Sequence, residues 1–216
     1  SRVIADQNNL YVHNCLFDQI THNGPNGGAL YAYQKPLLMF IEETYFRKCS
    51  TNDKSSTNYG GAVYYVNTAS DTHCKMKKVC SSSCVCGETG SSYNSFGQFA
   101  YLQVCNNLED EISVNDTSII NSMNNHANSY RTLRLNSGKE EIGKTNISFN
   151  TCFYYSALYC HPTSSSSSQS TSFYLEYSSI TNNTANGYNC IYLDRSGAKK
   201  EMRFNNIINN GQGQKD

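Results

Sequence analysis

Aromatic residues recur along the chain at positions that could build a binding surface. Five tyrosines and one arginine each follow an aliphatic residue in a short apolar segment: Tyr31, Tyr64, Tyr101, Arg134, Tyr159 and Tyr192. The steps between them are 33, 37, 33, 25 and 33 residues. If the segments are strands that stack on one another, the six side chains form one outward-facing column. Such a column either fixes strand register by ring stacking or offers an aromatic platform for sugar rings or a protein surface.

Cysteines form a second group that could carry chemistry. The chain has 10 cysteines, and Cys74, Cys80, Cys84 and Cys86 lie within one short segment. Paired Cys-x-x-Cys knuckles of zinc sites are missing, so we expect disulfides and no metal, with buried free thiols as the alternative. Cys49 and Cys84 occupy equivalent places in adjacent repeats, where a strand spacing of about 4.8 Å suits a disulfide. Cys74 is then expected to pair with Cys80 or Cys86.

Acidic residues fall into two further columns of the repeat. One column holds Glu42, Asn115 and Glu176, and the next holds Glu43, Asp116 and Tyr177. Glycoside hydrolysis needs two carboxylates that converge on one bond. Along its column Glu42 would lie about 14 Å or more from Glu176, which is too far for such a pair. The polygalacturonase signatures Asn-Thr-Asp, Asp-Asp, Gly-His-Gly and Arg-Ile-Lys are also absent, so we expect surface acids, no catalytic residue and no cofactor.

Two short patterns repeat and predict the elements that carry these residues. Residues 27–33 (Gly-Gly-Ala-Leu-Tyr-Ala-Tyr) return at 60–65, with weaker copies further along the chain. A bent strand pair starts at Met39 and again at Ile112, Ile142 and Phe173, with inward residues before and after a tight corner. A repeat of about 20–50 residues without helical periodicity is typical of a solenoid. We therefore predict an all-β, right-handed parallel β-helix of about six turns, with three short strands per turn, as a single domain over residues 1–216.

The amino-acid composition limits the expected cellular location and the expected binding partners. Charge is balanced, with 17 basic and 17 acidic residues, so we expect no nucleic acid partner. The many cysteines favour an oxidising, extracellular location, and Asn115, Asn146 and Asn182 stand in glycosylation sequons. An apolar stretch of about 18 residues is lacking, so any membrane anchor is expected outside this sequence. We interpret the chain as a segment of a longer extracellular protein.

The repeat motifs resemble those of a known family. Gly-Gly-Ala at 27–29 and 60–62, with Phe-Arg-Lys-Cys at 46–49 and Phe-Asn-Thr-Cys at 149–152, resembles the paired short motifs of chlamydial polymorphic membrane proteins. The richness in Asn, Ser, Tyr and Cys is similar to that of trichomonad surface proteins. The resemblance implies an extracellular right-handed β-helix that takes part in host adhesion. The chain departs from the family pattern where Cys replaces the final Asn of both Phe-containing motifs.

Three functions remain open at this stage. We expect a non-catalytic surface protein that adheres to a host or neighbouring cell-surface protein or glycan. The first alternative is a coat or filament subunit, because the unpaired strand edges at the ends of a solenoid allow end-to-end self-association. The second is a carbohydrate-active enzyme of the pectin-lyase type, which uses the same coil.

Overall fold

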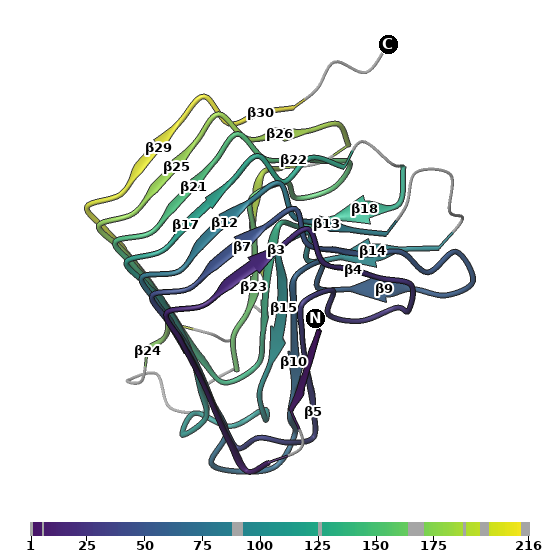
Figure 1. Ribbon diagram of the computed structural model, residues 1–216. Helices are drawn as coiled ribbons and strands as arrows, with labels where there is room; N and C mark the ends of the chain where they lie inside the picture. Colours follow the sequence, from purple (N-terminus) through teal and green to yellow (C-terminus); the bar gives the residue numbers. More distant parts are fainter. Residues whose placement is uncertain are drawn as a thin grey trace.

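The chain winds into a right-handed parallel β-helix whose successive turns lie flat on one another (Figure 1). The computed structural model describes residues 2–5, 7–87, 93–124, 127–163, 171–187, 189–194 and 199–212. All regular elements in these residues are strands, and no helix among them could cross a membrane. The predicted all-β solenoid is confirmed.

Three long parallel sheets form the walls of the coil. Sheet A consists of β1 (Val3–Ala5), β5 (Leu30–Tyr33), β10 (Val63–Val66), β15 (Ala100–Gln103), β19 (Leu133–Asn136), β23 (Leu158–His161) and β27 (Ile191–Leu193). Sheet B consists of β2 (Asn9–His13), β6 (Leu38–Glu42), β11 (His73–Lys77), β16 (Glu111–Asn115), β20 (Lys139–Gly143), β24 (Thr171–Glu176) and β28 (Lys199–Arg203). Sheet C consists of β3 (Leu16–Asp18), β7 (Tyr45–Arg47), β12 (Cys80–Ser82), β17 (Ser118–Ile120), β21 (Asn146–Ser148), β25 (Ser179–Thr181) and β29 (Asn206–Ile208).

Shorter strands extend the turns between sheets C and A. One small sheet holds β4 (Thr21–His22), β8 (Ser50–Thr51) and β13 (Val85–Cys86). A second holds β9 (Asn58–Tyr59), β14 (Ser95–Phe96) and β18 (Ser129–Tyr130). A third holds β22 (Thr151–Cys152), β26 (Thr184–Ala185) and β30 (Gly211–Gln212).

Strand register follows the aliphatic positions seen in the sequence. Each strand of sheet A pairs in parallel with its equivalent one turn away, so Val63 lies between Leu30 and Ala100. Val3 pairs with Leu30 and adds a seventh strand, although no Gly-Gly pair precedes it. Gly60 adopts a φ of 62°, a left-handed conformation that costs glycine little because glycine has no Cβ. Any larger residue would place its Cβ against the Val63 carbonyl oxygen.

Inward side chains of successive turns stack into columns that fill a narrow core. The rings of Phe17 and Phe46 in sheet C are parallel, with centroids 4.9 Å apart. Val63 and Leu30 are fully buried in sheet A, and each such aliphatic side chain stabilises the fold by about 1.5–3 kcal/mol. The short apolar segments of the sequence are therefore sufficient, because each strand contributes few side chains to the interior.

One predicted register is wrong by two residues. The bent strand pair was expected to start again at Ile142, but Glu140 pairs with Ile112 and Ile142 pairs with Val114. Sequence pattern alone could not detect this shift, because a displacement of two residues preserves the alternation of inward and outward side chains. Glu140 consequently points into the core and is fully buried.

The same two-residue shift places two further residues outside the coil, although the expected register of the strand pair that starts at Ile142 would point them inward. Lys144 and Phe149 lie at exposed corners in the left-handed conformation, with φ of 49° and 57°. The corner between sheets B and C repeats on every turn, with one left-handed residue in each, namely Asn14, Glu43, Lys78, Asp116, Lys144, Tyr177 and Phe204. In four of these corners a hydroxyl of the next residue donates to the carbonyl oxygen two residues before it, as Thr44 Oγ1 does to Glu42 at 2.8 Å. These corners place one outward residue per turn along the edge of sheet B.

Candidate functional site

The predicted aromatic column exists and keeps the predicted register. Tyr64 pairs with Tyr31 on one side and with Tyr101 on the other. The Tyr31 and Tyr64 rings are stacked, with centroids 5.4 Å apart and planes inclined by 9°. The Arg134 guanidinium carbon lies 4.8 Å from the Tyr101 ring centroid and 5.3 Å from that of Tyr159. The Arg134 guanidinium therefore contacts the tyrosine rings on both sides, and the column has no break at this position.

A second aromatic stack covers the column. It is formed by four residues of the shorter strands and the loop after β22, namely Tyr59, Phe96, Tyr130 and Tyr154. The Tyr59 ring meets the Tyr101 ring edge-on, with centroids 4.9 Å apart. As a result Tyr64 and Tyr101 are only 8% and 7% exposed. These rings hold adjacent turns in register and leave little open surface for a ligand.

This covering stack is not among the predicted features, although the sequence contains a signal for it. Tyr59 and Phe96 directly precede Gly60 and Gly97, so an aromatic residue stands at the same place in successive repeats. Arg131 takes the corresponding place of the glycine, and its guanidinium carbon lies 3.8 Å from the Tyr159 ring centroid. Burial among these rings lowers the pKa of Arg131 to about 10. Arg131 and the surrounding aromatic rings therefore pack against one another between adjacent turns.

All ten cysteines are free thiols in this structure. Cys49 and Cys84 nevertheless occupy equivalent positions on neighbouring strands, directly before the paired residues Ser50 and Val85. Both are fully buried, and the hydrogen bond with Cys84, together with burial, raises the pKa of the Cys49 thiol. The predicted alignment of this pair is confirmed, but the bond is not formed here.

The second predicted cysteine pairing is not formed in this structure either. Cys74 points into the core from β11, whereas Cys80 is exposed on the outer side of β12. Cys86 is buried in a different sheet, where Thr51 Oγ1 donates a hydrogen bond to its sulfur at 3.5 Å. Within the described ranges, no group of three or more His, Cys, Asp or Glu residues is placed to hold a metal ion.

The three sequon asparagines are all partly exposed. Asn115 lies on the outer face of sheet B, and Asn146 lies on the outer face of sheet C. Asn182 occupies a corner with a φ of 55°. Each side chain is therefore in a position that a glycan could occupy.

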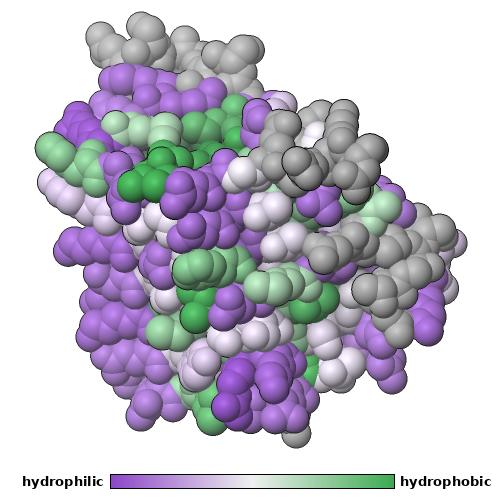
Figure 2. Space-filling view, turned by 90° about the horizontal axis from the view of Figure 1, so that it is seen from above, coloured by the Kyte–Doolittle hydropathy of each residue, from purple (hydrophilic) through white to green (hydrophobic). Residues whose placement is uncertain are grey.

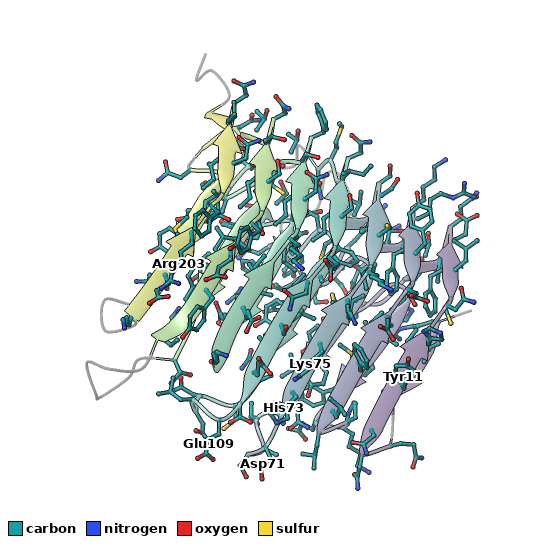
Figure 3. All side chains as sticks on the ribbon, turned by 90° about the vertical axis from the view of Figure 1, so that its left-hand side faces the viewer. Tyr11, Asp71, His73, Lys75, Glu109 and Arg203 are labelled. Carbon is teal, nitrogen blue, oxygen red and sulfur yellow. The ribbon has the colours of Figure 1, made fainter. Side chains whose placement is uncertain are left out.

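The outer face of sheet B carries most of the charged side chains that sequence analysis aligned. Figure 3 looks onto this face, with Tyr11 on β2 at one end, Lys75 on β11, and Arg203 on β28 at the other end. Glu42, Asn115 and Glu176 share one column, as predicted, and Lys77 and Gly143 occupy this column on the strands between them. Oppositely charged side chains occupy this column in the first turns, whereas a glycine interrupts it in the later turns.

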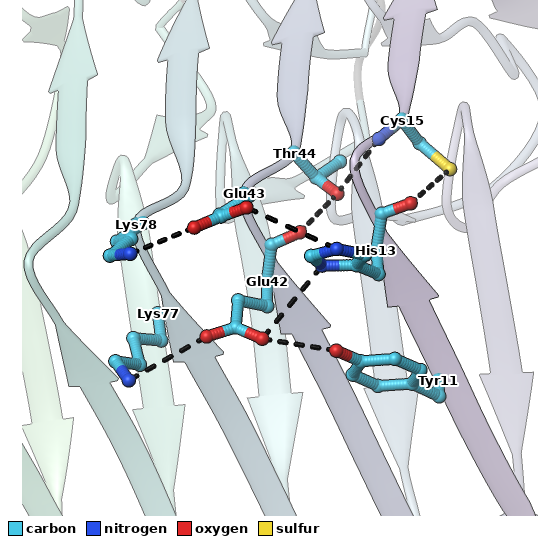
Figure 4. Close-up of polar contacts among 8 residues, drawn as sticks. All are labelled: Tyr11, His13, Cys15, Glu42, Glu43, Thr44, Lys77 and Lys78. Atoms are coloured by element: carbon cyan, nitrogen blue, oxygen red, sulfur yellow. Dashed lines mark hydrogen bonds and ion pairs between the residues drawn. The ribbon is translucent and has the colours of Figure 1, made fainter.

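In the first three turns, ion pairs fill the face (Figure 4). The Glu42 carboxylate accepts a hydrogen bond from the Tyr11 hydroxyl at 3.0 Å and lies 3.6 Å from Lys77 Nζ. In the adjacent column Lys78 Nζ donates to Glu43 Oε1 at 2.8 Å, and this hydrogen bond lowers the pKa of Glu43. Opposite charges thus satisfy one another along this part of the sheet.

At the fifth turn the same column is interrupted by Gly143, and a hollow of about 510 Å³ opens. Gly143 lies between Asn115 and Glu176, which pair with it from the neighbouring strands. A Cβ at Gly143 would lie 2.3 Å from Asn115 Oδ1, so this oxygen faces the space that a side chain would fill. Asn115 Nδ2 donates to Ser113 Oγ at 2.7 Å, which fixes the amide orientation. We call this space the Gly143 hollow.

Three columns line the Gly143 hollow. Its floor is formed by Asn115, Gly143 and Glu176, one wall by Asp116, Lys144 and Tyr177, and the other by Glu141 and Tyr174. Lys139, from the next column of the same face, and Ile142 complete the lining. The Tyr177 ring stacks on the ring of Phe204 from the next turn, with centroids 5.0 Å apart and planes inclined by 14°. These two rings are 58% and 74% exposed. A stacked pair of exposed rings therefore lies beside the hollow, whereas Tyr64 and Tyr101 of the predicted column lie under cover.

Charges within the hollow are partly paired. Lys139 Nζ lies 3.4 Å from Glu141 Oε2 and 5.2 Å from the Tyr174 ring centroid. Glu176 Oε1 lies 4.0 Å from Arg203 Nε. The lining thus offers carboxylate and amide acceptors and ammonium donors next to two tyrosine rings.

Two carboxylates of the hollow come from adjacent strands. Tyr174 pairs with Glu141, and Glu176 pairs with Gly143, so Glu141 and Glu176 are diagonal neighbours on one face. Strand spacing and rise place their Cα atoms roughly 8 Å apart. This pair was not predicted, because acids within one column, such as Glu42 and Glu176, lie far apart, whereas Glu141 and Glu176 belong to different columns.

A second hollow, of about 640 Å³, lies on the outer side of sheet C and the adjoining corner. Leu16, Tyr45, Cys80 and Ile120 contribute to its lining, together with serine side chains. Figure 2, seen from above Figure 1, shows hydrophobic residues in separate patches among hydrophilic ones. This second hollow has a lower share of charged groups than the Gly143 hollow and has no exposed stacked ring pair at its edge.

Comparison of the chain with protein-family models, with curated proteins and with solved structures gave no match.

Proposed function

We propose that the chain is a non-catalytic extracellular or cell-surface β-helix protein that mediates adhesion through the outer face of sheet B. The ligand, a glycan or a protein of a host or neighbouring cell, binds at the Gly143 hollow. The resemblance of the repeat motifs to chlamydial and trichomonad surface proteins supports this role, as does the number of cysteines.

The observation that carries the proposal is the gap left by Gly143 in an otherwise filled face. Neighbouring positions of this column carry Asn115 and Glu176, and a glycine in a strand marks a place where another molecule can approach the backbone. The hollow combines a concave shape, convergent polar groups and aromatic walls, which together are typical of ligand sites.

Filling the hollow tests the proposal. Gly143→Gln places a neutral side chain over the floor, and only the flexible end of Asn115 has to move to admit it. We expect this variant to lose binding on a glycan array and to cultured cells while its thermal unfolding stays close to that of the unsubstituted protein. Ser179→Gln, on the outer face of sheet C, is the matched control and should bind normally. Undiminished binding by a folded Gly143→Gln variant would rule this site out.

One observation favours a second candidate function, glycoside hydrolysis. Glu141 and Glu176 are close enough that their carboxyl groups could flank a scissile bond, since such pairs lie about 5–9.5 Å apart. Incubation with neutral and acidic polysaccharides, followed by an assay for reducing ends, decides between the two functions. Turnover that disappears in Glu141→Gln and Glu176→Gln would establish the enzyme, and its absence leaves adhesion as the proposal.

A further inference from the structure

We propose that the ligand of the Gly143 hollow is an uncharged saccharide, recognised by ring packing on Tyr177 and by hydroxyl contacts to the carboxylates of the floor and walls. This inference rests on the proposed function and specifies the class of molecule that the hollow selects. Three properties of the lining support it.

The first property is the charge of the hollow. Its lining holds three carboxylates, Asp116, Glu141 and Glu176, and two ammonium groups, Lys139 and Lys144. Lys139 already faces Glu141 at 3.4 Å and Glu111 at 3.9 Å. The lining residues together carry one net negative charge, and Arg203 beside Glu176 lies 2.9 Å from the further carboxylate of Glu201. An anionic sugar would therefore meet like charge, which opposes binding.

The second property is the exposed ring surface at the edge of the hollow. Tyr177 and Phe204 form a stacked pair that is largely open to solvent, and their left-handed corner positions project them beside sheet B. Stacking on Phe204 favours one orientation of the Tyr177 ring in the absence of a ligand. The C–H face of a pyranose ring packs against such a ring without needing a charge.

The third property is the supply of acceptors around that ring. Asn115 Oδ1 faces the space above Gly143, and Glu176 lies beyond it on the next strand. Carboxylates and amide oxygens accept strong hydrogen bonds from sugar hydroxyls. A volume of about 510 Å³ is in the range of small-molecule sites. The hollow therefore matches the amphipathic character of a neutral sugar, with one apolar face and a rim of hydroxyls.

The test uses the whole chain, produced in a host that does not glycosylate proteins. Binding is measured by glycan array and by calorimetry against neutral oligosaccharides and against sialylated, sulfated and uronic-acid oligosaccharides. We expect the neutral members to bind, with little change in affinity as sodium chloride is raised, because exposed charge interactions are screened by salt and ring packing is not. Tyr177→Ala should lower the affinity about tenfold, which corresponds to the loss of one aromatic contact.

A second variant covers the case in which Tyr177→Ala disturbs the corner. Glu176→Gln keeps the size of the side chain and should also weaken binding of neutral sugars, whereas Ser179→Gln should leave it unchanged. Selective binding of sulfated or sialylated members would overturn the inference on ligand class while upholding adhesion at this hollow. Cell binding that is lost in Gly143→Gln, together with an array negative for every saccharide, would indicate a protein partner and also overturn the inference. A chain that binds neither cells nor saccharides would overturn the proposed function itself.

Discussion

The ring of Tyr64 lies flat on the ring of Tyr31 one turn below, with 5.4 Å between their centroids. Because Tyr64 is nearly inaccessible to solvent, its truncation removes packing and no ligand surface. We expect Tyr64→Ala to lower the free energy of unfolding by about 3 kcal/mol, measured by urea denaturation. The exposed Tyr33→Ser on the same face should change it by less than about 0.5 kcal/mol. If Tyr64→Ala abolished glycan binding without loss of stability, the column would be a binding surface after all.

Alkaline pH should weaken the aromatic cluster. Burial and the hydrogen bond that Tyr159 donates to Asp194 raise the pKa of Tyr159 to about 12, whereas an unfolded tyrosine titrates near pH 10. Between these two values the unfolded chain has lost this proton and the folded chain keeps it, so the free energy of unfolding falls as pH rises from about 10 to about 12. Tyr159→Phe cannot ionise, and its stability should fall less steeply over this interval. Denaturant titrations across the interval measure both slopes, and identical slopes would contradict the assignment.

Much of the fold could be predicted because a solenoid repeats its physical requirements on every turn. Leu30, Val63 and Leu133 each occupy an inward position of sheet A, and the residue after each one points outward. Alternation along a strand then fixes the tyrosine column. The prediction failed at Glu140, because a strand displaced by two residues has the same alternation and the buried acid contradicts the expected apolar pattern.

The candidate site was harder to predict, because it depends on what covers a surface and on what is missing from it. Tyr64 was correctly aligned, but its exposure is decided by Tyr59 from another strand. Gly143 has no side chain, so nothing in the sequence marks it as a functional residue. The space that a side chain would occupy is part of the hollow. Glu141 and Glu176 are close only through the diagonal between strands, which the columns considered separately do not reveal.

Cys49 and Cys84 should form a disulfide when the protein is exposed to a disulfide oxidant such as oxidised glutathione. Their equivalent positions on neighbouring strands suit the bond, and closing the loop between them should stabilise the fold by about 3–4 kcal/mol. Mass spectrometry of non-reduced peptides should find the two peptides joined. A Cys49→Ser variant, in which Cys84 has no such neighbour, is the control. Peptides that join Cys84 to the exposed Cys80 would contradict this prediction.

A chain of asparagines should stabilise the last turns. Asn183 Nδ2 donates to the Ile147 carbonyl oxygen and to Asn210 Oδ1, both at 2.9 Å, and Asn183 Oδ1 accepts from Asn150 Nδ2 at 3.0 Å. Asn183→Ala removes these buried bonds and should lower the free energy of unfolding by about 3 kcal/mol. Asn206→Ala, on the exposed face of sheet C, should have little effect. Equal stability of the two variants in urea would show that the buried amide contributes nothing.

Glycosylation of Asn115 should close the Gly143 hollow. The Asn115 side chain is part of the floor, so a glycan attached to its Nδ2 atom, on the Ser113 side of the amide, would stand at the edge of the hollow and block a ligand from entering it. We expect protein secreted from a glycosylating host to bind saccharides and cells weakly, and enzymatic removal of the glycan to restore binding. Thr117→Val removes the sequon and leaves the Asn115 side chain in place, so this variant should bind equally well from either host. Peptide mass spectrometry reports the occupancy of Asn115, and strong binding by fully glycosylated protein would place the ligand elsewhere on the coil.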